Sequence, residues 1–141
     1  MLQLFGKVFL IAVAVNFPWE MAQAYLYAPM GDWVTATMRC FRAAIVDGAI
    51  VLGIAVGGTA VFRRRDWCRR LGTARVLFIV VAGATIAVLI ERFSLSAGRW
   101  NYGQLMPIIP GIDVGAIPVL QMMVVPLIVF HIAARTTSSP L

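Results

Sequence analysis

Four long apolar runs occupy most of this chain, at residues 4–27, 41–62, 74–93 and 115–134. Each run approaches the ~20 residues that an α-helix needs to cross ~30 Å of hydrocarbon. Only short polar segments separate them. The pattern therefore predicts an all-α fold, a polytopic membrane protein in which residues 1–141 form one four-helix transmembrane domain.

Three carboxylates interrupt these runs, namely Glu20, Asp47 and Glu91. A charged side chain in hydrocarbon is costly, so such residues usually face the protein interior and mark function. Asp47 lies 16 residues before Arg63, and Glu91 lies 16 residues after Arg75. At 1.5 Å per residue, both distances are about 24 Å. We expect the three acids to meet at one depth.

Uncharged polar residues extend this layer. Asn16, Glu20 and Gln23 are spaced by four and three residues, which places them on one helix face. Gln121 on the fourth run lies 14 residues before Arg135, about 21 Å away and at a similar depth. Because lipid disfavours a polar stripe, these side chains should point at the other helices.

Aromatic residues flank the same layer. Trp19 precedes Glu20, and Trp100 and Tyr102 follow Glu91. The expected connecting loops 28–40 and 94–114 are rich in aromatic residues and prolines. An aromatic belt at the membrane interface explains some of these residues. A lid over an acidic pocket is the alternative interpretation.

Composition and charge agree with a membrane protein. The chain is 61% hydrophobic and 13% charged, whereas soluble domains carry about a quarter charged residues. Much of the net charge of +6 lies in the Arg63–Arg70 loop. By the positive-inside rule this loop is cytoplasmic, which predicts a bacterial inner-membrane protein with both termini in the cytoplasm. The loop would contact anionic lipid headgroups, and nucleic-acid binding is not expected.

Few residues suit a metal. The two cysteines, Cys40 and Cys68, fall on opposite sides of the membrane in this topology, and there is one histidine, His131. We predict neither a metal site nor a cofactor. The second run carries Gly53-x-x-x-Gly57 followed by Gly58, a pattern of close helix packing that we assign to the core of the monomer rather than to a dimer.

The last third of the chain combines Glu91, the turn Gly98-Arg99-Trp100-Asn101-Tyr102, and Gly115-Ala116-Ile117-Pro118-Val119-Leu120-Gln121. This segment, residues 91–130, resembles the membrane lycopene cyclases of the heteromeric type. Those enzymes have an acidic helix residue, a Gly-x-Trp-x-aromatic turn and a Pro-hydrophobic-Glu-Glu sequence. It is also similar in outline to the membrane carotenoid hydratases. The chain has Leu120-Gln121 where the cyclases have the Glu-Glu pair, and its N-terminal half resembles small bacterial membrane proteins without an assigned activity.

The resemblance implies acid-catalysed cyclisation or hydration of an isoprenoid or polyene lipid that enters from the membrane. Such chemistry needs a carboxylic acid that keeps its proton, and aromatic faces that stabilise a carbocation. We assign proton donation to Glu91 or Glu20, with Asp47 sharing or orienting the proton. Asn16, Trp19, Gln23, Trp100, Tyr102 and Gln121 are the expected substrate-binding residues.

Other functions stay open, and so does enzyme status. The carboxylates can form a structural network, paired with Arg42 or Arg92 or bonded to Trp and Tyr donors. The chain can also be a non-enzymatic subunit or carrier of a larger membrane complex, or a homo-oligomer. Lipoprotein signal peptidases share the four-helix outline, but their Asp-containing motifs do not occur in this chain.

Overall fold

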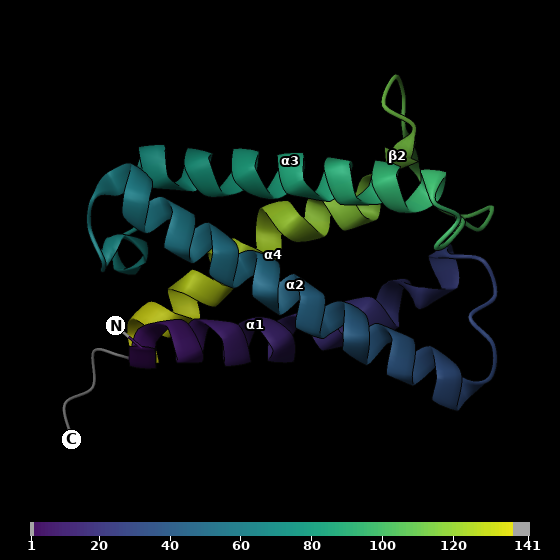
Figure 1. Cartoon of the computed structure of the whole chain (residues 1–141), viewed down its shortest axis with the longest axis horizontal. Helices are drawn as coiled ribbons and strands as arrows, with labels where there is room; N and C mark the ends of the chain where they lie inside the picture. Colours follow the sequence, from purple (N-terminus) through teal and green to yellow (C-terminus); the bar gives the residue numbers. More distant parts are fainter. Residues whose placement is uncertain (1, 137–141) are drawn as a thin grey trace.

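The computed structural model describes residues 2–136 and consists mainly of four helices (Figure 1). Each of these four is long and apolar enough to cross a membrane. The helices are α1 (Leu2–Gln23), α2 (Trp33–Phe62), α3 (Thr73–Ser96) and α4 (Ala116–Thr136). The shorter elements are the 3₁₀ turns η1 (Ala24–Leu26) and η2 (Trp67–Arg69) and the strands β1 (Ile108–Ile109) and β2 (Val114–Gly115). The all-α prediction is confirmed, as is the number of long apolar helices among the described residues.

The helices do not pack evenly. α1 lies along α2 and also contacts α4, and α3 packs on α4. α2 and α3 approach each other near the arginine-rich connection that joins them, and they diverge toward their other ends (Figure 1). We call these two ends of the bundle the arginine-rich end and the open end. Residues of both diverging helices line a cavity at the open end.

α2 is longer than the sequence indicated. The expected loop 28–40 ends at Asp32, because residues 33–40 form the first turns of this 30-residue helix. Asp32 caps the helix, and its Oδ1 accepts a hydrogen bond from the Thr35 backbone N–H at 3.3 Å. At 1.5 Å per residue α2 is about 45 Å long, well beyond the ~30 Å of a hydrocarbon core. The polar residues near its start concealed a helix that extends beyond the apolar run.

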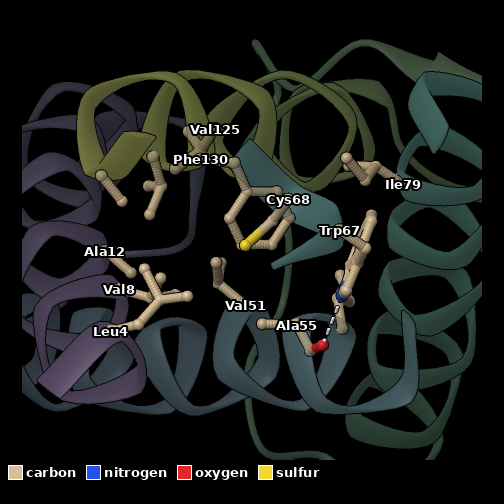
Figure 2. Packing of buried hydrophobic residues seen from close by; sticks show 13 residues of the cluster. Leu4, Val8, Ala12, Val51, Ala55, Trp67, Cys68, Ile79, Val125 and Phe130 are labelled. Carbon is tan, nitrogen blue, oxygen red and sulfur yellow. Dashed lines mark hydrogen bonds between the residues drawn. The ribbon is translucent and has the colours of Figure 1, made fainter. Parts of the chain in front are cut away.

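The arginine-rich half of the bundle has a solid core. Side chains from all four helices meet there, among them Val8, Val51, Ile79 and Phe130 (Figure 2). Trp67 of η2 folds back into this core and is fully buried. Its indole Nε1 donates a hydrogen bond to the Ala55 backbone oxygen at 2.8 Å, drawn as the dashed line in Figure 2. η2 therefore contributes its indole ring to the core at the arginine-rich end.

The glycines of α2 divide into two groups. A Cβ on Gly58 would lie 2.1 Å from the Trp67 ring, so this glycine makes room for the indole. Gly53 and Gly57 have no atom within 4 Å of such a Cβ. Assignment of the whole motif to the core of the monomer was therefore wrong for Gly53 and Gly57, and it holds for Gly58. On α3, Gly83 plays the packing role, since its Cβ would lie 2.0 Å from the Met122 backbone oxygen of α4.

At the open end, the connections after α1 and α3 join each other. Tyr27 and Tyr102 form an isolated antiparallel bridge, with the Gly103 N–H donating to the Leu26 oxygen at 2.8 Å. Beyond it, β1 and β2 pair antiparallel, Ile108 with Gly115. The expected loop 94–114 is thus an ordered strap, and it holds the aromatic residues of both connections together.

Candidate functional site

A cavity of about 670 Å³ lies at the open end between α1, α2, α3 and α4. Its volume is within the ~300–1,000 Å³ of small-molecule sites. Most of the residues that the sequence indicated line this cavity: Glu20, Gln23, Asp47, Glu91, Trp100 and Gln121. The expected convergence of the three acids from three different helices is confirmed.

Gln121 of α4 is the hub of the polar network on the cavity wall. Its Nε2 lies 2.8 Å from Glu20 Oε1, 2.9 Å from Asp47 Oδ2 and 2.9 Å from Asn16 Oδ1. Its Oε1 accepts a hydrogen bond from Gln23 Nε2 at 2.9 Å. One amide thus connects α4 to α1 and α2. An NH₂ group has two hydrogens, so these three acceptors share two donors.

Glu20 and Asp47 form a close pair within this network. Their carboxyl groups lie on the same amide nitrogen, Gln121 Nε2, at 2.8 and 2.9 Å. The Glu20 Oε1 also accepts from Gln23 Nε2 at 2.7 Å. Every other hydrogen-bond partner of this pair is a neutral amide, and within residues 2–136 no salt bridge reaches either acid. Two carboxyl groups hydrogen-bond each other only when a proton lies between them.

Glu91 has different partners. Its Oε2 accepts hydrogen bonds from the Tyr102 hydroxyl and from the Trp100 Nε1, the latter at 3.3 Å. The Tyr102 oxygen in turn accepts from the Gly115 N–H at 2.9 Å. Burial and the hydrogen bond to Glu91 raise the pKa of Tyr102, so its hydroxyl remains a donor. Glu91 therefore ties the strap to α3.

The remaining expected residues lie beside the cavity. Asn16 is fully buried behind Gln121, and its Nδ2 donates to the Ala12 oxygen at 2.9 Å. Trp19 packs against the apolar core, and its buried Nε1 has no hydrogen-bond partner among the described residues. The Oε1 of Gln23 is also buried and has no hydrogen-bond partner among the described residues. Gln23 as a whole is 4% exposed and lines the cavity. That oxygen is a free acceptor next to the carboxyl pair.

Sequence reasoning did not place Arg39 and Arg99 at the site, and it considered Arg42 only as an ion-pair partner of the acids, yet all three arginines line the cavity. Arg42 and Asp47 are five residues apart on α2, about 140° around the helix axis, so helical spacing alone gave no sign that both reach the cavity. The expected ion pair of a cavity acid with Arg42 or Arg92 is not found in residues 2–136, where the salt bridge joins Arg64 to Asp66.

Aromatic rings cover part of the opening. Tyr27 and Trp100 both line the cavity, with ring centroids 6.4 Å apart and edge to face. Tyr27 also contacts Tyr102 at 5.7 Å. Tyr25 and Trp33, by contrast, are 69% and 74% exposed, as residues of an interfacial belt would be. The aromatic residues of the open end thus divide into a group at the cavity, namely Tyr27, Trp100 and Tyr102, and an exposed group, namely Tyr25 and Trp33.

Within residues 2–136 no group of three His, Cys, Asp or Glu side chains is arranged to hold a metal ion. Comparison with protein-family models, with curated proteins and with solved structures found no match to this chain. The chemistry of the site therefore has to be argued from its own geometry.

Proposed function

We propose that this protein is a membrane-embedded acid catalyst, in which the Glu20–Asp47 pair protonates a double bond of an isoprenoid or polyene lipid. The proposal is carried by one observation: the carboxyl groups of Glu20 and Asp47 lie 2.8 and 2.9 Å from the same neutral amide nitrogen, Gln121 Nε2, on the wall of a cavity between membrane-length helices. No cation contacts them in the described residues, so nothing there competes for the proton that they share.

The lipid enters sideways, through the space between α2 and α3. Apolar side chains line this route, including Val46 and Ile50 of α2 and Ala87 and Ile90 of α3. Trp100 and Tyr27 supply aromatic faces that stabilise a carbocation by cation–π attraction. The cavity thus combines an acid, an apolar channel and rings for a cationic intermediate.

The reaction balances without a cofactor. The pair donates its one shared proton to one carbon of a double bond, which leaves a carbocation on the other carbon and raises the negative charge of the pair from one to two. In a cyclisation, a second double bond attacks this cation, and the ring loses a proton back to the pair, so that the product is an isomer. In a hydration, water adds to the cation and returns a proton to the pair.

Glu20, rather than Glu91, is the better donor. Both acids accept two hydrogen bonds. Glu20 shares the Gln121 amide with a second carboxyl group, Asp47, with which it can share a proton. The Glu91 Oε2, in contrast, bonds Tyr102 and Trp100. We therefore assign Glu91 to positioning of the strap. We place the protein in a bacterial inner membrane with both termini in the cytoplasm. The cavity then faces the outer leaflet, and the Arg63–Arg70 loop contacts anionic headgroups on the inner side.

Deuterium transfer tests this assignment. The purified protein is placed in vesicles of its host's own extracted lipids in D₂O, and the isoprenoids are then analysed by mass spectrometry. The wild-type protein should place one non-exchangeable deuterium on carbon. Glu20→Gln and Asp47→Asn should reduce this transfer by about 100-fold or more, the usual contribution of a general acid. Asp66→Asn, which changes an exposed acid of the arginine-rich connection, is the matched control.

A structural role is the second candidate, because the same hydrogen bonds join α1, α2 and α4. In that case Glu20→Gln and Asp47→Asn lower the yield of folded protein, and the wild type transfers no deuterium. Tryptophan fluorescence, to which the buried Trp67 contributes, reports folding in every variant. Folded variants that transfer deuterium as the wild type does would remove the catalytic proposal.

A further inference from the structure

Three arginines surround the cavity at its outer rim. Arg39 and Arg42 belong to α2, and Arg99 follows α3 across the gap. All three side chains are exposed, and no salt bridge joins any of them to a carboxylate within residues 2–136. Guanidinium groups with five N–H donors are thus available on both sides of the lateral opening.

The C-terminal cap of α3 positions Arg99 beside the cavity. α3 ends in a Schellman motif, with the Gly98 N–H donating to the Leu95 oxygen at 3.1 Å and the Arg99 N–H donating to the Ser94 oxygen at 2.9 Å. Gly98 has φ +64°, the left-handed conformation that glycine tolerates best. The Arg99 guanidinium then lies over the Phe93 ring, 5.1 Å from its centroid.

On α2, the positions of Arg39 and Arg42 along the helix bring both residues to the cavity. Arg42 precedes Asp47 by five residues, about 8 Å along the helix axis, and Arg39 precedes it by eight, about 12 Å. Both arginines line the same cavity as Asp47 and lie nearer than Asp47 to the N-terminal end of α2. Apolar residues, among them Val46 and Met122, also line the cavity.

The charges of the cavity do not cancel. The Glu20–Asp47 pair with one shared proton carries one negative charge, and Glu91 adds at most one more. Three arginines face at most two negative charges, which leaves an excess of at least one positive charge at the rim. Arginine forks match phosphate oxygens in a bidentate geometry, and lipid-facing cavities admit the attached hydrocarbon. The matching ligand is an amphiphile with an anionic phosphate head.

We propose that the cavity takes a phosphate-bearing isoprenoid lipid, with its phosphate on Arg39, Arg42 and Arg99 and its hydrocarbon chain between α2 and α3. This inference narrows the substrate class of the proposed function, and it rests on that function only in placing the chain's double bonds beside Glu20 and Asp47. The neutral carotenoid that the sequence resemblance implied lacks a group for the three arginines.

Binding of tritiated geranylgeranyl phosphate to the full-length protein, in nanodiscs of zwitterionic phosphatidylcholine, tests the proposal. Unlabelled geranylgeranyl phosphate should displace the probe. Geranylgeraniol, which has the same chain without the phosphate, and inorganic phosphate should each compete at least about tenfold less well, the equivalent of one charged hydrogen bond. Inorganic phosphate competing equally well would make this a site for soluble anions and overturn the lipid assignment. Geranylgeraniol competing equally well would overturn the role of the arginines.

Substitutions locate the phosphate. Arg39→Gln, Arg42→Gln and Arg99→Gln should each weaken binding about tenfold or more. Arg92→Gln is the matched control, because Arg92 is an exposed arginine of α3 that does not line the cavity. Equal losses in the control, or wild-type affinity in all three cavity variants, would overturn the proposal. Tryptophan fluorescence of each variant, measured without the probe, separates misfolding from lost binding.

The two proposals fail in different ways. Glu20→Gln and Asp47→Asn should retain probe affinity, because neither substitution touches the arginine rim. If the wild type binds the phosphate lipid through the arginines but transfers no deuterium, the catalytic proposal fails and the lipid site stands. If deuterium transfer is full in the three arginine variants and the probe does not bind, the lipid site fails and the catalytic proposal stands.

Discussion

Replacing Gln121 by leucine should destabilise the bundle more than any other single change in the polar network. Gln121 is 2% exposed, and its side-chain amide is bonded to partners on α1 and α2. Leucine has a similar size, so the substitution opens no large cavity. It removes the bonds and leaves buried partners behind, above all the fully buried Asn16.

The magnitude follows from the hydrogen-bond geometry. The two N–H groups and the carbonyl of Gln121 make three bonds at a time. Side-chain hydrogen bonds between membrane helices are worth ~0.6 kcal/mol on average and at most ~1.7 kcal/mol each. Three such bonds give about 2–5 kcal/mol in the free energy of unfolding. Water that enters the cavity can hydrate Asp47 but not Asn16, so we expect a value inside this range rather than at its lower edge.

Equilibrium unfolding in mixed dodecyl maltoside and SDS micelles, followed by Trp67 fluorescence, measures this loss. Leu120→Ala is the control, because Leu120 is the neighbouring residue on α4 and is 45% exposed. It should change the free energy of unfolding by less than ~0.5 kcal/mol. A double-mutant cycle of Asn16→Ala with Gln121→Leu should give a coupling of ~0.6–1.7 kcal/mol. A Gln121→Leu variant as stable as the control, with no coupling to Asn16, would refute the reasoning.

Two further predictions concern the two ends of the bundle. Gly58→Ala should lower the free energy of unfolding by about 1–3 kcal/mol, since its methyl group would lie 2.1 Å from the buried Trp67 ring. Gly53→Ala is the control, because no atom lies within 4 Å of the added methyl group. An equal free energy of unfolding in the two variants would contradict the packing of Gly58 against Trp67. Tyr102→Phe removes the hydroxyl between Glu91 and Gly115, so amide hydrogen exchange in the strap should accelerate, unlike in the exposed Tyr25→Phe variant. Burial raises the pKa of Tyr102 above its ordinary 10.0, so its contribution to stability is complete below pH 10 and declines as the pH rises further; Tyr102→Phe should weaken this alkaline loss, and an unchanged pH profile would contradict it.

The depth of the acids could be predicted because the rise of a helix is fixed. Counting from Arg63 and Arg75 placed Asp47 and Glu91 at one level, and both line the cavity. The partners of each acid could not be predicted in this way. Depth says nothing about rotation around the helix axis, and rotation decides that Glu91 meets the strap while Asp47 meets Gln121.

Hydropathy was misleading where polar and apolar residues alternate along a short segment. Trp67 lies among arginines, so its segment looked like a solvated loop, yet the indole fills the core because Gly58 leaves room for it. The arginines of the open end were missed for a related reason. Arg39 fell in the expected loop 28–40 and Arg42 was considered only as an ion-pair partner of the acids, whereas the continuation of α2 to Trp33 brings both to the cavity wall.

The solid packing around Trp67 has a consequence for how the acid site would be recharged. Tightly fitted side chains of the core fill the bundle between the carboxyl pair and the arginine-rich end, so this end offers no path to the site. In the proposed function, a proton spent by the pair is then replenished from the compartment that the open end faces. Turnover should then follow the acidity of that one compartment, with no coupling to a gradient across the membrane.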